Sequence, residues 1–385
     1  MDNLTHSLLG LVGAKAGLER LSPGATAMCV LAANAPDADV TAMFGGYWFY
    51  LKHHRGITHS LIGTLSLAVL VPLLFWVGDR VLARWRGREP QVRLKGLLLA
   101  SALMSASHPV LDWTNNYGVR PWLPWDGSWY YGDLVFIVDP WLWLALGGAA
   151  FLLTARRGWR AGAWAALGLI LTLAMLLLPR SSGLPFPIVA QIVWLAGLVG
   201  LFFAWRRNVA ARFGPKLAAA ALAFVVVYWS ALALLHARAL THANVVARSG
   251  AQQSGETLLR VAALPLPVMP LRWRIVAETE QSFYRFDISA LGAPNHAGES
   301  WQRAEKFPKP RGADAARAAR ASEDARAQIF LGFSRFPAAR VETNCPGLSL
   351  VQFADLRFTE PGPARGDGGG GFRVEVAVPH QQPVP

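Results

Sequence analysis

The chain has 385 residues, of which 53% are hydrophobic and only 16% are charged. This composition is typical of a polytopic membrane protein and argues against a soluble one. The formal net charge of +13 could indicate a nucleic-acid-binding protein, but many arginines and lysines lie in short loops between apolar segments, where they determine membrane topology. We therefore expect membrane lipids, and no nucleic acid, as partners.

The chain contains only two cysteines, Cys29 and Cys345, which lie far apart in the sequence. This count argues against a disulfide framework and against a cysteine-based zinc site. Nitrogen and oxygen atoms must then hold any bound metal ion. The first residues lack the basic region and cleavage signal of a secretory leader, so we expect His6 to remain in the mature protein.

Six apolar segments are long enough, or nearly so, to cross a bilayer, which takes about 20 helical residues. They are residues 60–78, 94–111, 140–155, 161–178, 187–205 and 217–235. The preceding stretch, 8–35, is divided into two shorter apolar pieces by charged residues and Pro23. We predict a polytopic all-α membrane domain with about six transmembrane helices and an N-terminal re-entrant hairpin.

The loops between the first and second, third and fourth, and fifth and sixth segments are rich in arginine and lysine. Such loops face the cytoplasm, so the alternate loops and the chain after His236 are expected on the periplasmic or outer side. Composition turns polar from about Arg238, and period-two alternation appears at 372–378, with β-rich runs at 272–288 and 348–359. We predict two domains, a helical membrane domain at 1–236 and a small β-rich (α+β) extracytoplasmic domain at 237–385.

Side chains that can bind metal ions crowd the first third of the chain. They are His6, Asp37, Asp39, His54, His59, His108 and Asp112. Imidazoles and carboxylates are costly beside hydrocarbon, so their repeated placement at the ends of apolar segments indicates a role such as binding a divalent cation.

His108 and Asp112 are four residues apart, and this spacing places both side chains on one face of a helix, within reach of a single ion. The alternative is that His108 caps one helix and Asp112 begins the next loop. The predicted location at the membrane boundary favours the ligand interpretation.

The segment 53–60 packs three histidines and Arg55 directly before the first clear span. Gly56 permits a tight bend that could bring His54 beside His59, whereas His53 is the weakest ligand candidate. The alternative is a basic interfacial anchor. The planar guanidinium of Arg55 suits a negatively charged substrate, particularly phosphate, because it makes paired hydrogen bonds.

Asp37 and Asp39 follow Pro36, which is expected to end an apolar helix and leave two carboxylates at the membrane edge. One can ligate an ion, while the other bridges a second ion or accepts a proton from water. An ordinary solvated turn is the alternative. Taken alone, His6 is more typical of a surface or helix-end histidine.

Taken together, four elements resemble the inner-membrane metal-dependent hydrolase family typified by YdjM. They are 5–7, 36–39, 54–60 and 108–112, and the run 273–279 resembles the tryptophan-containing strand of long members. The family is distantly similar to zinc-dependent phospholipase C and P1 nuclease. The resemblance implies a bacterial inner-membrane location, several zinc ions in a helical site, and phosphoester hydrolysis by a metal-bound hydroxide.

Carried over by motif, the resemblance makes His6, Asp37, His59, His108 and Asp112 the first ligand candidates, followed by Asp39 and His54. The chain departs from the soluble phospholipases because no clear second H-x-x-x-E element follows His108. The number of zinc ions is left open at one to three, with Asp133 or Asp139 as candidates for completing a second site.

We therefore predict a membrane-bound hydrolase that uses a metal-activated water, with Zn²⁺ as the expected ion, Asp39 as the proton acceptor and Arg55 as the group that stabilises the anion. Aromatic side chains crowd 113–131, as in an interfacial belt, so a phospholipid or lipid-linked phosphoester is the expected substrate. The alternatives are a non-enzymatic metal carrier or sensor, and a membrane-anchored interaction protein. Serine-hydrolase, phosphate-loop and dinucleotide motifs are absent from the sequence.

Overall fold

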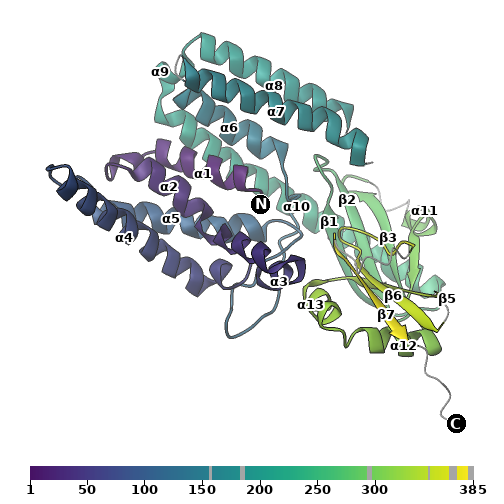
Figure 1. The fold of residues 1–385 in the computed structure, drawn as a ribbon. Coiled ribbons are helices and arrows are strands. Elements are labelled where there is room, and N and C mark those ends of the chain that lie inside the picture. Colours follow the sequence, from purple (N-terminus) through teal and green to yellow (C-terminus); the bar gives the residue numbers. More distant parts are fainter. Residues whose placement is uncertain (156–157, 183–186, 293–296, 346, 364–370, 380–385) are drawn as a thin grey trace. The chain divides into compact units, whose positions relative to one another are not determined.

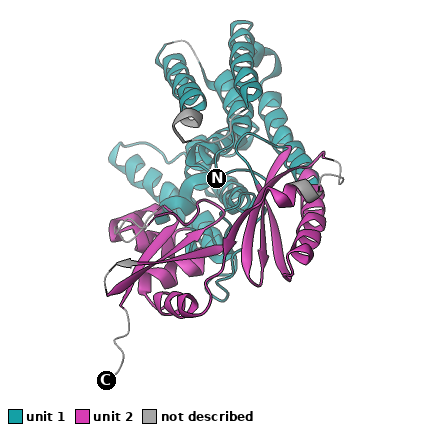
Figure 2. Ribbon diagram, turned by 90° about the vertical axis from the view of Figure 1, so that its right-hand side faces the viewer, with its two compact units in different colours: residues 1–39, 55–234, 265–270 teal, residues 40–54, 235–264, 271–385 magenta. Residues whose placement is uncertain are grey.

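The computed structural model describes the chain except residues 156–157, 183–186, 293–296, 346, 364–370 and 380–385 (Figure 1). The chain forms two compact units, each built from separate stretches of sequence (Figure 2). Unit 1 comprises 1–39, 55–234 and 265–270, and unit 2 comprises 40–54, 235–264 and 271–385.

Unit 1 begins with two short helices, α1 (Asn3–Lys15) and α2 (Ala25–Asn34), joined through a short 3-10 helix, η1 (Leu18–Arg20). Asp2 caps α1 by accepting a 2.9 Å hydrogen bond from the backbone nitrogen of Thr5. A Cβ at Gly10 would lie 2.7 Å from the carbonyl oxygen of Cys29, so glycine allows the two helix backbones to approach closely. The predicted hairpin is present, and its depth in a membrane stays a prediction.

Five helices of the described chain are long and apolar enough to cross a membrane. They are α4 (Leu61–Trp85), α5 (Leu94–Trp113), α7 (Trp159–Ser182), α8 (Ile188–Arg206) and α10 (Pro215–Gln253). The sixth predicted span forms a shorter apolar helix, α6 (Pro140–Thr154), of 15 residues. At 1.5 Å per residue it is about 22 Å long, shorter than the roughly 30 Å of a bilayer core. The helical domain predicted with about six spans is thus present, with five candidate spans and this shorter apolar helix in the described chain.

The remaining helices of unit 1 are short. They are the 3-10 helix η3 (Ile57–His59) and α9 (Val209–Phe213), while the 3-10 helix η2 (Ala35–Gly45) begins in unit 1 and runs into unit 2. Of the basic loops that predict orientation, Arg156 and Arg157 lie outside the described residues. The membrane orientation stays a prediction.

Unit 2 contains two small sheets. One has the order β1 (Leu258–Pro265), β2 (Arg272–Thr279), β3 (Ser282–Ser289), β4 (Glu305–Pro308), and the other the order β5 (Pro337–Cys345), β6 (Leu348–Asp355), β7 (Arg373–Pro379). The pairs from β2 to β4 and from β5 to β7 are antiparallel, with Val276 opposite Arg285 and Val351 opposite both Val341 and Val376. This confirms the predicted α+β character of the C-terminal region.

Helices complete unit 2. They are α3 (Tyr47–His53), α11 (Ala297–Gln302), α12 (Ala313–Ala321), α13 (Ala325–Phe333) and the last part of α10. One core joins Ala243 and Ala247 of α10 to Trp273 and Phe286 of the first sheet. At the start of α3, the hydroxyl of Tyr47 accepts a 3.2 Å hydrogen bond from the backbone nitrogen of Phe372. Small alanines on α10 let the helix lie close to the large aromatic side chains of the sheet.

Candidate metal centre

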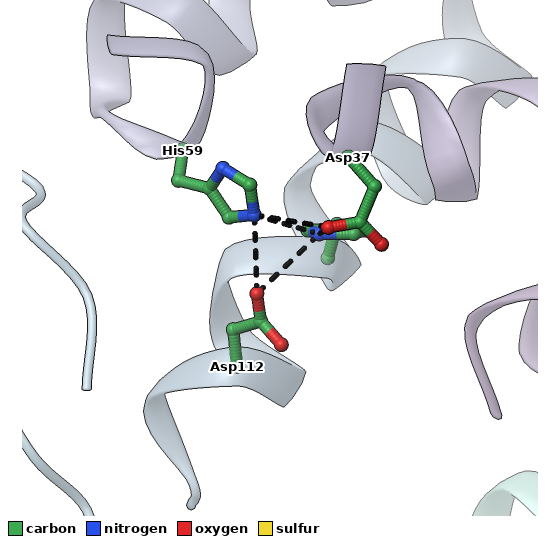
Figure 3. Close-up of side chains that lie close together, drawn as sticks. Asp37, His59 and Asp112 are labelled. Atoms are coloured by element: carbon green, nitrogen blue, oxygen red, sulfur yellow. Dashed lines mark hydrogen bonds and ion pairs between the residues drawn. The ribbon is translucent and has the colours of Figure 1, made fainter. Parts of the chain in front are cut away.

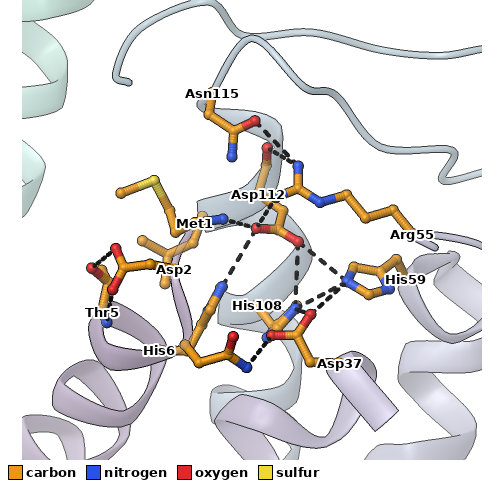
Figure 4. Close-up of polar contacts among 12 residues, drawn as sticks. Met1, Asp2, Thr5, His6, Asp37, Arg55, His59, His108, Asp112 and Asn115 are labelled. Carbon is orange, nitrogen blue, oxygen red and sulfur yellow. Dashed lines mark hydrogen bonds and ion pairs between the residues drawn. The ribbon is translucent and has the colours of Figure 1, made fainter. Parts of the chain in front are cut away.

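Four side chains from three elements of unit 1 converge on one point; Figure 3 labels three of them, and Figure 4 labels His108 as well. Asp37 comes from η2, His59 from η3, and His108 and Asp112 from one face of α5. One nitrogen or oxygen atom of each lies within 4.8 Å of the corresponding atoms of the other three. His59, His108 and Asp112 are buried, and Asp37 is half-buried, so the group has one partly open side.

The separations within this group are nearly equal. His59 Nε2 lies 3.1 Å from His108 Nε2, 3.4 Å from Asp37 Oδ1 and 3.2 Å from Asp112 Oδ2. His108 Nε2 lies 3.5 Å from Asp37 Oδ1 and 3.4 Å from Asp112 Oδ2. In a tetrahedral zinc site with bonds of about 2.0 to 2.1 Å, neighbouring ligand atoms are about 3.3 to 3.4 Å apart. These five separations are close to the edges of such a site, and the sixth, between the oxygens of Asp37 and Asp112, lies within 4.8 Å.

A backbone carbonyl fixes the orientation of the His108 ring. His108 Nδ1 lies 2.6 Å from the carbonyl oxygen of Ala33. A carbonyl can only accept a hydrogen bond, so Nδ1 carries the proton and the neutral ring turns the lone pair of Nε2 toward the other three side chains. This is the tautomer that a metal-binding histidine requires.

His59 is oriented in a similar way by Asp39. Its Nδ1 lies 3.3 Å from Asp39 Oδ2 and 3.1 Å from the hydroxyl of Thr58. A carboxylate behind Nδ1 favours a proton there, which leaves the lone pair of Nε2 facing that of His108 at 3.1 Å. Two lone pairs and two carboxylates at this distance repel one another, and a cation among them would relieve that repulsion.

Asp112 uses its two oxygens differently (Figure 4). Oδ1 lies 3.4 Å from His6 Nε2 and accepts hydrogen bonds from Arg55 and from the amino group of Met1. Oδ2 is buried, has no hydrogen-bond partner among the described residues, and faces the two imidazole nitrogens. A buried carboxylate oxygen without a donor is expensive, and a metal ion is one group that would satisfy it.

Arg55 is buried behind Asp112. Its guanidinium donates to Asp112 Oδ1 at 3.0 Å, to Asn115 Oδ1 at 3.1 Å and to the carbonyl of Gly118 at 3.0 Å, while its backbone nitrogen donates to Asp39 at 2.7 Å. Its φ of 49° places a bulky residue in the left-handed region, which is costly for any residue other than glycine. The backbone turns here so that Arg55 reaches both acidic side chains.

His6 lies beside the converging group. Its ring is buried and stacks on that of His108 with centroids 3.8 Å apart. Neither ring nitrogen has a hydrogen-bond partner among the described residues. Burial and the nearby cationic groups hold the pKa of His6 well below its ordinary value, so the ring is neutral and can act as a ligand.

Asp37 presents one oxygen to the two histidines. Its Oδ1 lies 3.4 Å from Nε2 of His59 and 3.5 Å from Nε2 of His108. Asn3 donates a 2.8 Å hydrogen bond to the second oxygen of Asp37. The sequence analysis missed Asn3 and Asn115. Asn3 lies three residues before His6 on α1, and this spacing on a helix is a usable signal, whereas Asn115 lies beyond the end of α5.

The other predicted site residues lie elsewhere. His54 belongs to unit 2, where its ring stacks on Tyr50 with centroids 4.6 Å apart. Asp133 is buried and has a φ of 53°. Asp139 caps α6 and accepts a 3.0 Å hydrogen bond from the hydroxyl of Tyr228. Within the described residues, the converging group includes none of these three, and their metal-binding role stays a prediction.

Comparison with known proteins adds a family similarity. Residues 1–181, which include all four converging side chains, match the family described as YdjM inner membrane protein. The chain is 27% identical over 155 residues to the uncharacterized protein YfhP of Bacillus subtilis (strain 168), covering 38% of this chain and 44% of YfhP. The chain thus spans less than half the length of this relative, and no solved structure matches it. Together with the five long apolar helices, the match indicates a membrane protein.

Proposed function

We propose that the protein is a membrane-bound, metal-dependent hydrolase whose ion is held by Asp37, His59, His108 and Asp112. The observation that carries this proposal is the convergence of two imidazole nitrogens and two carboxylate oxygens at separations of 3.1 to 3.5 Å. Zinc is the ion we favour, because mixed imidazole and carboxylate ligands at tetrahedral spacing suit it.

A bound divalent ion would supply Lewis acidity and would lower the pKa of a water molecule toward neutrality. The protein's own residues prepare the site for it. Asp39 holds His59, and Arg55 holds Asp112, so both act as positioning residues in this proposal. His6 lies next to the four ligands, with its Nε2 3.4 Å from Asp112 Oδ1, and its neutral ring would supply a further nitrogen if a second ion bound.

A phosphoester attached to a lipid is the substrate class that this site suits best. Asp112 lies one residue from the end of the apolar helix α5, and His59 lies two residues before the apolar helix α4 begins. In helices that span a bilayer, these positions fall at the depth of the lipid headgroups. The exposed tryptophans Trp113, at the end of α5, and Trp122 and Trp125, on the loop that follows, are typical of the same depth.

A non-enzymatic metal-binding role is the competing proposal, and one observation favours it. Four protein ligands at tetrahedral spacing can fill the coordination sphere of zinc, as in structural sites, whereas catalytic sites keep a position open. The half-buried side chain of Asp37 favours a catalytic site instead, because water and substrate can reach the four ligands from the side of Asp37.

Purified full-length protein should contain about one to three zinc ions per chain, and His108→Ala should lower that content. His53→Ala is a matched control, because His53 is exposed and bonds only locally to the Phe49 carbonyl at 2.8 Å. The zinc-loaded protein should hydrolyse a phosphodiester such as bis(p-nitrophenyl) phosphate, and His108→Ala should not. Unchanged metal content in His108→Ala would refute the site, and bound zinc without hydrolysis of phosphodiesters or phospholipids would favour the structural role.

A further inference from the structure

A second feature of unit 1 is an apolar cavity of about 580 Å³ among α1, α6, α7 and α8. Its volume is typical of sites for small organic ligands. Its walls are unusually aromatic, with rings contributed by Trp143, Phe151, Trp164, Trp194, Phe202 and Trp205. Neither a metal ligand nor any other charged side chain lines it.

The polar edges of the four lining tryptophans are all bonded to protein. The indole nitrogen of Trp164 donates to Thr154 at 2.9 Å, that of Trp194 to Thr172 at 3.1 Å, and that of Trp205 to the carbonyl of Ala155 at 2.8 Å. Trp143 donates to Asp2 at 3.0 Å and to Thr5 at 3.1 Å.

The hydroxyl of Thr172 is also used, since it donates to the carbonyl of Gly168 at 2.7 Å. A water molecule in a buried site needs two to four polar partners, and this cavity presents ring faces and methyl groups instead. An apolar occupant therefore fits the cavity better than water does.

Glycines keep the cavity wide. A Cβ placed on Gly162 or Gly168 of α7 would meet no heavy atom within 4 Å, apart from its own helix backbone and its neighbours in the chain. Glycine inside a helix is destabilising relative to alanine. At Gly162 and Gly168 a side chain would fit but is missing, so the cavity stays open although α7 loses stability. Such an arrangement is expected where a ligand fills the space.

The first residues of the chain connect one end of the cavity with the candidate metal centre. Trp143, which lines the cavity, donates to Asp2, and the amino group of the adjacent Met1 donates to Asp112. From Trp143 the cavity extends along α6 to Phe151, a distance of about 12 Å at 1.5 Å per residue. An elongated apolar chain in this space would bring its first atoms to Trp143, next to these N-terminal residues.

We propose that this cavity binds the hydrocarbon chain of a membrane lipid whose phosphate end lies at the metal centre. The proposal rests on the proposed function for the identity of the headgroup, but not for the binding of the chain. The apolar, exposed side chains of α7 and α8, such as Ile170 and Val193, place lipid next to the cavity in a bilayer, so a chain can enter sideways.

The test uses the full chain in lipid nanodiscs that contain a phosphatidylethanolamine with a diazirine on one acyl chain. After irradiation, mass spectrometry should find the label concentrated on cavity residues of α6, α7 and α8. Gly168→Leu should reduce this labelling about tenfold, because the new side chain overpacks the occupied space. Gly200→Leu is the matched control: Gly200 also has open space around its Cβ position but does not line the cavity.

Labelling of the cavity should persist in His59→Ala, because chain binding does not need the metal. The His59→Ala variant therefore separates the two proposals. A failed hydrolase assay with intact cavity labelling would refute the proposed hydrolysis but not the binding of the lipid chain. Label spread evenly over the outer faces of α7 and α8, with no difference between Gly168→Leu and Gly200→Leu, would show ordinary surrounding lipid and overturn the inference. Absence of label from the cavity in the parent protein would overturn it as well.

Discussion

Both units of this protein bury carboxylates, but they treat them differently. In unit 2, Asp355 is fully buried with Arg357, which donates to its Oδ2 at 2.6 and 2.9 Å, while the backbone nitrogens of Arg335 and Arg357 donate at 3.2 and 3.1 Å. In unit 1, Asp112 gives one oxygen to Arg55 and turns the other toward two imidazole nitrogens. The first carboxylate has its counter-charge and donors within the protein, whereas the second leaves a place for an external cation.

The comparison predicts opposite responses to zinc in two matched variants. Asp355→Asn should destabilise unit 2 by about 3 kcal/mol, because breaking a buried ion pair leaves an uncompensated charge, and zinc should not change that loss. Asp112→Asn should instead abolish the stabilisation of unit 1 by zinc, which for the parent protein is about 2.7 kcal/mol at a hundredfold excess over Kd. Hydrogen exchange of peptides from β6 and α5, with and without zinc, measures the two effects separately. Equal zinc responses in the parent protein and in Asp112→Asn would remove the distinction between the two carboxylates.

A smaller effect on zinc binding is expected for Asp39, which contacts the ligand His59 from behind. Asp39→Asn should weaken zinc binding about 10- to 100-fold while leaving one ion bound at saturation, because Asp39 orients His59 without belonging to the converging group. Titration with a competing zinc chelator gives the affinity. Asp126→Asn is a suitable control, since Asp126 is exposed and bonds locally to Ser128. A complete loss of zinc in Asp39→Asn would instead make Asp39 a ligand.

The smallest effect concerns Asp139, a buried carboxylate that accepts hydrogen bonds from the hydroxyl of Tyr228 and from two backbone nitrogens. Burial raises its pKa to about 6, although hydrogen bonds from Tyr228, Leu142 and Trp141 oppose the rise. Because the folded pKa is above the unfolded one, this group stabilises the fold below about pH 4, and that contribution disappears as pH rises through about 6. Asp139→Asn keeps a cap for α6 but cannot ionise, so the free energy of unfolding should decline less between pH 4 and 7 than in the parent protein, by on the order of 1 kcal/mol. Apparent Tm measured across this pH range reports the difference. An unchanged pH profile in this variant would contradict the assignment.

Much of the candidate centre was predictable because its signals are local. The four-residue spacing of His108 and Asp112 places them on one helix face, and Pro36 and the following carboxylates mark a helix end. The structure brings four of the seven predicted ligand candidates together. Metal binding by these residues stays a prediction.

The parts that sequence did not predict depend on long-range geometry. The guanidinium of Arg55 bonds to Asp112, 57 residues away, which no local signal indicates, and its expected contact with a substrate stays a prediction. Hydropathy identified α6 as a sixth span because it reports apolar character, whereas the position of the helix ends decides the length. The sequences of strands β1, β4 and β5 show no alternation of apolar and polar residues that distinguishes them from the flanking residues.

The stretch 40–54 has a practical consequence for dissecting the molecule. It leaves unit 1 after Asp39 and returns at Arg55, yet it packs within unit 2, where Tyr47 bonds to Phe372. A truncated protein that ends near residue 236 would therefore lack the partners of α3 and expose its aromatic side chains directly beside two residues of the candidate centre. The properties of such a fragment would reflect the disrupted stretch 40–54 as much as the helical region. Point variants of the intact chain are therefore better suited to separating the roles of the two units.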